Sequence, residues 1–300
     1  MKKTLLIITS LVFITSAVFP QSKVGIDNLI DMDGLLYKLN DDKPYTGKVF
    51  DLYDNEQKKF DGRYKNGLRN GKWTWWSEGG KMGSSGNYKN GIKDGKWTRW
   101  YENGQKKEEA TFKDGKESGL LTDWYENGQK KMEVTYKDGK EDGLLTDWYE
   151  NRQKKREGTY NNGKQVGKWT WWYENERKRR EVTYKDEKVD GLLTDWYENE
   201  QKKMEGTYNN GKQVDKWTYW YENGQTKQEG IFKDGKQVDK WTAWYRTGEK
   251  KSGGTYRDGK KDGPWTEWYK TGQKYYEDIY KDRKLIESKK WDRDGNLIED

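Results

Sequence analysis

One series of tryptophans is the strongest candidate for a binding site in this sequence. Its members recur every 24 residues without an insertion, and a basic residue follows most of them seven positions later. Indole rings spaced along a strand surface can stack on the apolar faces of sugars. The candidate ligand-binding residues are Trp100, Trp124, Trp148, Trp172, Trp196, Trp220 and Trp244. A cation–π ladder that only stiffens an exposed sheet explains the same pattern, so both interpretations remain open.

Enzymatic chemistry has little support from the residue types. The chain has no Cys and no His, which removes thiol nucleophiles, the Ser-His-Asp triad and most zinc or copper sites. A glycosidase needs one distinct pair of carboxylates, whereas Glu102, Glu126 and Glu150 are copies of one another. We therefore predict a protein that is not an enzyme and that uses no cofactor and no metal.

The period that positions these tryptophans extends through most of the chain. Tyr or Phe recurs every 24 residues from Tyr64 to Tyr280, and Thr recurs likewise from Thr74 to Thr266. Within the unit 96–119, two β-prone runs are separated by Asn103-Gly104 and Asp114-Gly115, which favour tight hairpin turns. The sequence therefore predicts an all-β fold: an elongated repeat array of antiparallel β-hairpins that forms one long, twisted, single-layer sheet.

A two-residue turn at Asn103-Gly104 would place position 102 opposite 105, position 100 opposite 107 and position 97 opposite 110. Two faces follow from this register. We call the first the core face, and it would carry Trp97, Tyr101, Ala110 and Phe112. We call the second the outer face, and it would carry Thr98, Trp100, Lys107 and Thr111.

The same register predicts two sets of cross-strand pairs. On the core face a large residue opposes a small one, which suggests that an aromatic ring covers a glycine. These pairs are Trp73/Gly86, Trp97/Ala110, Trp169/Val182, Trp217/Gly230 and Trp241/Gly254. On the outer face a tryptophan opposes a cation, and the pairs are Trp100/Lys107, Trp124/Lys131, Trp148/Lys155, Trp172/Arg179, Trp196/Lys203, Trp220/Lys227 and Trp244/Lys251.

The ends of the chain differ from the repeats. Residues 1–17, extending to about 22, have two lysines, an apolar stretch and small residues, which is typical of a secretory signal peptide. We expect an N-terminal cap at 23–46, the repeat array at 47–280 and a C-terminal capping hairpin at 281–300. The expected location is therefore outside the cytoplasm: periplasmic, on the cell surface or extracellular.

Charge gives little support for a polyanionic partner. The net charge is +7, from 59 basic and 52 acidic residues whose signs alternate along the chain. This pattern predicts a solvated surface of mixed charge and no nucleic-acid partner. Lipid head groups have weak support, because the one basic cluster, 177–180, is diluted by neighbouring glutamates.

The units G-K-W-T-R-W-Y-E-N-G-Q-K-K at 95–107 and T-Y-K-D-G-K at 135–140 closely resemble the MORN-repeat variant of bacterial proteins. The resemblance covers roughly residues 44–290. It implies β-hairpin units that build an elongated sheet, and a role in membrane-lipid recognition or protein scaffolding. Proteins with this variant are often described as antitoxins of toxin–antitoxin pairs. The resemblance supplies no catalytic residues.

These observations lead to one principal expectation and two alternatives. The principal expectation is an exported, non-enzymatic repeat scaffold that binds another protein in the envelope or outside the cell. The first alternative is binding of a cell-surface glycan by the tryptophan series. The second is an antitoxin or immunity protein of a toxin–antitoxin pair, which the sequence itself cannot test.

Overall fold

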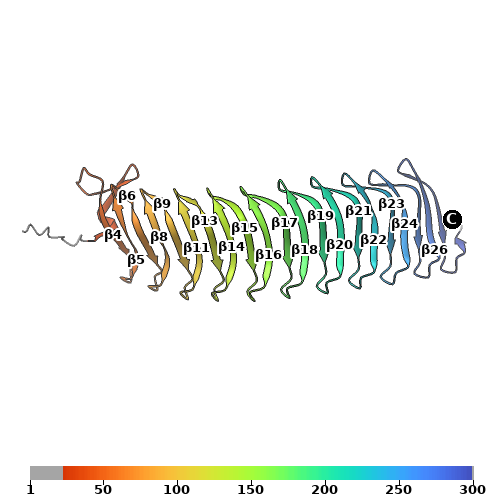
Figure 1. Cartoon of the computed structure of the whole chain (residues 1–300), viewed down its shortest axis with the longest axis horizontal. Helices are drawn as coiled ribbons and strands as arrows, with labels where there is room; N and C mark the ends of the chain where they lie inside the picture. The colour runs from red at the N-terminus through yellow and green to blue at the C-terminus, as the bar shows by residue number, and fades with distance from the viewer. Residues whose placement is uncertain (1–22, 299–300) are drawn as a thin grey trace, which may run out of the picture.

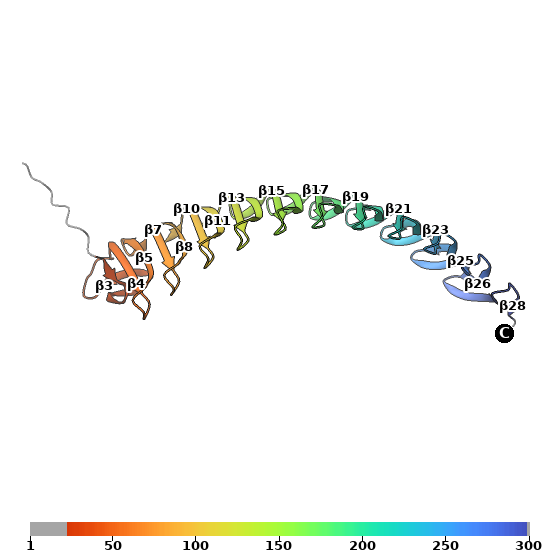
Figure 2. The same ribbon diagram turned by 90° about the horizontal axis from the view of Figure 1, so that it is seen from below.

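The computed structural model describes residues 23–298. The signal peptide predicted at 1–17, extending to about 22, lies outside the described residues. The described chain forms one 26-stranded sheet and a separate two-stranded hairpin. Neighbouring strands pair in antiparallel fashion in chain order, apart from β1 (Val24–Gly25), which pairs in parallel with β4 (Gly47–Leu52). The predicted all-β hairpin array is confirmed, and the sheet is open and curved along its length (Figures 1 and 2).

Strands of two kinds alternate along the sheet. The first kind comprises β5 (Lys58–Lys65), β8 (Met82–Lys89), β11 (Lys106–Lys113), β14 (Lys130–Lys137), β16 (Lys154–Asn161), β18 (Lys178–Lys185), β20 (Lys202–Asn209), β22 (Thr226–Lys233), β24 (Lys250–Arg257) and β26 (Lys274–Lys281). The second kind begins with β4. Three interrupted strands follow it: β6 and β7 (Leu68–Arg69 and Gly71–Trp76), β9 and β10 (Ile92–Lys93 and Gly95–Trp100), and β12 and β13 (Lys116–Glu117 and Gly119–Trp124). It continues with β15 (Lys140–Trp148), β17 (Lys164–Trp172), β19 (Lys188–Trp196), β21 (Lys212–Trp220), β23 (Lys236–Trp244), β25 (Lys260–Trp268) and β27 (Lys284–Trp291).

The two turns of each repeat have different geometries. Asp114 and Gly115 have φ values of 49° and 81°, as a two-residue type I′ turn requires, so this predicted hairpin turn is confirmed. The other turn is a three-residue loop: Tyr101 N donates to Gln105 O, and Gly104 N donates to Tyr101 O. Gly104 takes the left-handed conformation after a type I turn. The predicted pairing of 102 with 105 is therefore wrong.

A β-bulge beside this loop restores the register. Trp100 pairs with Lys106, whereas Arg99 pairs with Glu108, so Lys107 has no partner across the hairpin. The predicted pairing of position 100 with 107 is wrong. The extra loop residue and the extra bulge residue cancel, and Trp97 does pair with Ala110, as predicted.

The core face is buried as predicted. Its least exposed large side chains are Trp73, Trp169, Trp217 and Trp241, and Ala110 and Phe112 are buried beside Trp97. Tyr rings pack edge-on against these indoles; the centroids of Tyr160 and Trp169, for example, lie 5.1 Å apart. The predicted pairs Trp73/Gly86, Trp97/Ala110, Trp169/Val182, Trp217/Gly230 and Trp241/Gly254 all occur in the register.

The ring of each core Trp, however, covers a different glycine from the predicted one. A Cβ added to Gly86 would fall within 2.5 Å of Cγ of Trp97, which lies in the next hairpin. A Cβ added to Gly158 or Gly230 would likewise fall within 2.5 Å of ring atoms of Trp169 or Trp241. Each indole thus leans back over the preceding hairpin rather than over its own partner strand, and it joins consecutive repeats.

The residue eleven positions before each large core residue follows a size rule. Where the large residue is Trp, the earlier residue is Gly: Gly62/Trp73, Gly86/Trp97, Gly158/Trp169, Gly206/Trp217, Gly230/Trp241 and Gly254/Trp265. Where it is Leu, the earlier residue is Ala or Val: Ala110/Leu121, Val134/Leu145 and Val182/Leu193. The combined volume of the two side chains therefore varies little from one contact between repeats to the next.

Short elements lie beyond the first and last full hairpins. A 3₁₀ turn, η1 (Ile26–Asn28), leads into the hairpin of β2 (Leu29–Met32) and β3 (Leu35–Lys38). Leu36 N donates to Gly67 O, so this hairpin contacts a turn of the array. At the other end, β28 (Leu297–Ile298) pairs with β27. Within residues 23–298, no helix is both long enough and apolar enough to cross a membrane.

Candidate binding surface

The structure places the predicted tryptophan series in one row on the outer face, with each ring partly exposed. Hydrogen bonds between consecutive repeats hold the backbone of this row. Tyr101 Oη donates to Trp124 O at 2.8 Å, and Tyr125 Oη donates to Trp148 O at the same distance. Burial, followed by the charge of Glu150, raises the pKa of Tyr125, which keeps this donor protonated. The residues predicted to bind a ligand therefore lie together on a rigid surface.

The cations lie on different rings from those predicted. Lys106 Nζ lies 5.4 Å from the ring centroid of Trp124 in the next hairpin, whereas Lys107 lies over Tyr101. Lysines in the position of Lys106 likewise cover Trp148, Trp172, Trp196 and Trp220. The predicted Trp/cation pairing seven residues apart, from Trp100/Lys107 to Trp244/Lys251, is therefore wrong, because the bulge turns the second lysine away from the tryptophan row.

Two of the seven candidate rings have no lysine over them among the described residues. Met82 and Thr226 occupy the lysine position before Trp100 and Trp244. Trp244 also borders a shallow hollow that Lys216, Lys240 and Lys250 help to line. If the row binds a glycan, these two open rings are the ones on which a sugar can stack without displacing a cation.

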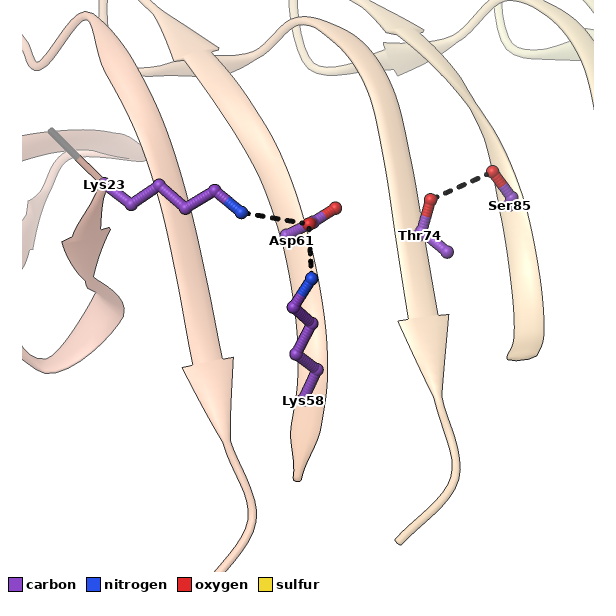
Figure 3. A network of polar contacts seen from close by, with 5 residues as sticks. All are labelled: Lys23, Lys58, Asp61, Thr74 and Ser85. Carbon is purple, nitrogen blue, oxygen red and sulfur yellow. Dashed lines mark hydrogen bonds and ion pairs between the residues drawn. The ribbon is translucent and has the colours of Figure 1, made fainter. Parts of the chain in front are cut away.

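Carboxylates hold the covering lysines in place on the outer face. Glu109 accepts from Lys96 and Lys106, each at 2.7 Å. Burial alone would raise the pKa of Glu109, but the two lysines outweigh it and lower the pKa below its usual value. Figure 3 shows the N-terminal part of the outer face. There Asp61 lies between Lys23 and Lys58, and the side-chain hydroxyl groups of Thr74 and Ser85 lie 3.2 Å apart.

Leucine replaces the lysine of the Lys96 position in three repeats. Leu120, Leu144 and Leu192 are 53%, 55% and 55% exposed on the outer face. In these repeats the facing glutamate keeps only one lysine; Glu133, for example, contacts Lys130. We call Leu120, Leu144, Trp124 and Trp148 the leucine patch. Sequence reasoning missed it, although the change from Lys to Leu within an otherwise constant position was visible in the repeat alignment.

Asp123 on the core face has no salt bridge among residues 23–298, unlike its equivalents in two later repeats. Asp147 pairs with Arg156, and Asp195 accepts from Arg180 at 2.6 Å and 2.8 Å. Asp123 instead faces Met132 across its hairpin and Glu108 on the preceding strand. Burial, followed by the charge of Glu108, raises the pKa of Asp123, although Lys131, Arg99 and Lys107 act in the opposite direction.

We expect Asp123→Asn to stabilise the protein at neutral pH. A carboxyl group whose pKa is raised on folding favours the folded state when protonated, and this contribution is lost as the pH rises through the folded pKa. The gain should stay below about 1 kcal/mol because the group is half exposed. It should disappear below about pH 4, where Asp is protonated in both states. Urea unfolding at several pH values measures it, and a variant that is less stable at pH 7 would contradict it.

The described residues contain no group of three Asp or Glu side chains placed to hold a metal ion. The surface described above combines partly exposed tryptophans, lysines held by glutamates, and the leucine patch. Repeat arrays of this kind present extended binding surfaces.

Comparison with known families agrees with this class of protein. The MORN repeat variant family matches residues 69–90, 93–114, 117–138, 165–186, 189–210, 216–234 and 261–282, just over half of the chain. The chain belongs to the MORN repeat variant family. Among curated proteins, no relative matches it.

Solved structures offer only a distant likeness. The crystal structure of TcdB2-TccC3-Cdc42 is 10% identical, with a TM-score of 0.19, over 85% of this chain and 18% of that one. The crystal structure of TcdB2-TccC3 is 12% identical, with a TM-score of 0.18, over 80% of this chain and 16% of that one. This chain spans less than a fifth of either, and a likeness at these TM-scores carries no argument about function.

Proposed function

We propose that this protein is an exported, non-enzymatic scaffold that binds another protein through the leucine patch of its outer face. The observation that carries the proposal is the exposure of Leu120 and Leu144 in neighbouring hairpins. Neighbouring strands lie about 4.8 Å apart, so equivalent residues of consecutive hairpins lie about 9.6 Å apart. Together with the partly exposed rings of Trp124 and Trp148, they form the kind of apolar surface that proteins use for recognition.

The surroundings of the patch indicate the chemistry of the partner. Lys96 and Lys168 flank the patch on either side, and both are exposed. Inside the patch, each facing glutamate and its single lysine neutralise one another, as in the pair of Glu157 and Lys154. A partner with an apolar centre and acidic residues at its rim would therefore complement this surface.

Site-specific cross-linking tests this proposal in the organism's own cells. A photoreactive residue at position 120 or 144 should capture one protein, whereas the same residue at position 240, its equivalent in a later repeat, should not. The double variant Leu120→Lys/Leu144→Lys should abolish capture. It should also bind the purified partner at least about tenfold more weakly, a loss of about 1.4 kcal/mol.

The lysine variant is a conservative probe of folding. Lys already occupies the equivalent position in the repeat of Lys96, where it pairs with Glu109. Capture that is unchanged by the double substitution would remove the patch from the proposal. Retention of a polysaccharide by the array, without capture of any protein, would favour the glycan alternative instead. Cell fractionation with and without residues 1–22 tests the proposed export.

A further inference from the structure

Folding sorts the turns of this chain onto two opposite edges. Strands alternate in direction, so every type I′ turn lies at one edge of the ribbon and every three-residue loop lies at the other (Figure 1). We call them the I′ edge and the loop edge. The charges of consecutive turns are therefore separated in space, because consecutive turns go to different edges.

The I′ edge is basic. Five of its turns place two lysines directly opposite each other: Lys113/Lys116, Lys137/Lys140, Lys185/Lys188, Lys233/Lys236 and Lys281/Lys284. Like charges in this arrangement destabilise a sheet. All ten lysines are exposed, and among residues 23–298 no carboxylate lies within 4.0 Å of any of them. From residue 65 to 284, each I′ turn carries net positive charge except 185–188, which is neutral.

At the loop edge the loops themselves are mainly acidic, whereas the lysines that follow most loops, such as Lys106 and Lys107, lie over aromatic rings. The exposed glutamates of this edge recur with the same period: Glu102, Glu126, Glu150, Glu174, Glu198 and Glu222. Glu176 and Glu200 add to them, and Arg152, Arg177 and Arg246 reduce the charge locally. None of the six periodic glutamates has a salt bridge within the described residues.

We propose that copies of this chain associate side by side, with the I′ edge of one ribbon against the loop edge of the next. Each hairpin contributes one turn to each edge, so the two edges have the same spacing along the array. Opposite charges on two parallel copies can then meet repeatedly along their length. The two opposite edges run along the whole length of the array in Figure 1. The curvature of the ribbon is seen in the view turned by 90° (Figure 2).

This contact is heterologous, because it joins two different surfaces of the same chain. A heterologous contact that does not close into a ring adds further copies without limit. The repeated like-charge pairs at the I′ edge have a physical role in this arrangement, since carboxylates of the neighbouring ribbon relieve their repulsion. The association does not involve the leucine patch and stands independently of the proposed function.

Sedimentation of the purified full array at two ionic strengths tests the proposal. At about 0.01 M salt the Debye length is about 30 Å, and at about 1 M it is about 3 Å. We expect dimers and larger species in the first condition and monomers in the second. A monomer at both ionic strengths would overturn the proposal.

Charge-exchange variants identify the edges. Lys113→Glu/Lys137→Glu/Lys233→Glu removes six units of positive charge from the I′ edge, and Glu102→Lys/Glu126→Lys/Glu198→Lys removes six units of negative charge from the loop edge. The first variant also turns repulsive lysine pairs into attractive Glu–Lys pairs, which preserves the hairpins. Each variant alone should stay monomeric at low salt, and their mixture should associate.

A control variant alters the net charge equally but away from the edges. Lys48, Lys72 and Lys240 are exposed lysines of the outer face. Their joint replacement by Glu should leave association unchanged. Association that is lost in this control, or that persists in either edge variant alone, would show that net charge or another surface is responsible and would refute the edge contact. Circular dichroism confirms that every variant is folded.

Discussion

Gly158→Val should lower the free energy of unfolding by about 3 kcal/mol, because it forces extra volume into a filled contact between repeats. The ring of Trp169 lies against the α-carbon of Gly158, and an added Cβ would fall within 2.5 Å of Cε3 of that indole. Trp169 is fully buried, so the ring has no open space to move into. Urea unfolding followed by circular dichroism measures the loss.

The same contact predicts its own rescue. Trp169→Leu alone leaves a cavity and should cost about 2 kcal/mol. The double variant Gly158→Val/Trp169→Leu recreates the pair that the chain already uses at Val134 and Leu145, which are directly opposite in the register. We therefore expect the double variant to recover most of the loss, with a favourable coupling free energy of about 2 kcal/mol or more.

Gly83→Val provides the matched control. Gly83 lies in a strand, and an added Cβ would meet only Trp75 O, at 3.7 Å. The substitution should change stability little, or raise it by limiting the unfolded chain. Equal losses at Gly83 and Gly158 would contradict the size rule, because the cost would then come from losing a glycine and not from the indole above it.

The sequence was sufficient to predict this array in outline because its signals are local and repeated. Aromatic residues at a constant period, with an Asp-Gly turn in each unit, leave few alternatives to stacked hairpins. The pairing of Trp97 with Ala110 followed from the same reasoning. Burial of that face was predictable because large and small residues alternate across it.

The site was less predictable because its geometry depends on one residue of register. Asn-Gly is compatible with a two-residue turn, but here Gly104 closes a three-residue loop and Lys107 becomes a bulge. Local preferences do not separate these two solutions. A slip of one residue moves a side chain to the other face, so the lysine expected over Trp100 lies over Tyr101.

Contacts between hairpins were also beyond the sequence rules used for a single hairpin. The choice of Gly86, rather than Ala110, as the residue under Trp97 depends on the direction in which the indole leans. The change between Gly and Ala or Val eleven residues before each large residue could have revealed it, because the two positions vary together across nine repeats. The charged edges were missed for a similar reason: net charge was judged along the chain and not by turn type.

Trp217→Ala should be the most damaging single truncation in the C-terminal half of the array, with a loss of about 4 kcal/mol. The indole is 1% exposed, it lies over Gly206, and it packs edge-on against Tyr208 at a centroid distance of 5.2 Å. Alanine at this position opposite glycine leaves neither hairpin with a side chain to fill the space. Unfolding followed by circular dichroism, together with hydrogen exchange, measures the effect.

Trp220→Ala, on the same strand, separates the core face from the outer face. Trp220 is partly exposed and contacts Lys202 at 5.8 Å, an interaction that contributes about 0.5–1 kcal/mol. Its backbone oxygen still accepts from Tyr197 after truncation. We therefore expect a loss of about 1 kcal/mol, and equal losses at the two positions would contradict the assignment of the faces.

The location of the damage should differ as well as its size. Each hairpin of a repeat array contacts only its neighbours, so a defect at one interface weakens the coupling between the two sides. With Trp217→Ala, hydrogen exchange should accelerate first in β20, β21 and β22, and unfolding should separate into two transitions. Trp220→Ala should leave a single transition. The large core residues that contact the preceding hairpin, Trp in most repeats and Leu in three, thus couple the hairpins of the ribbon.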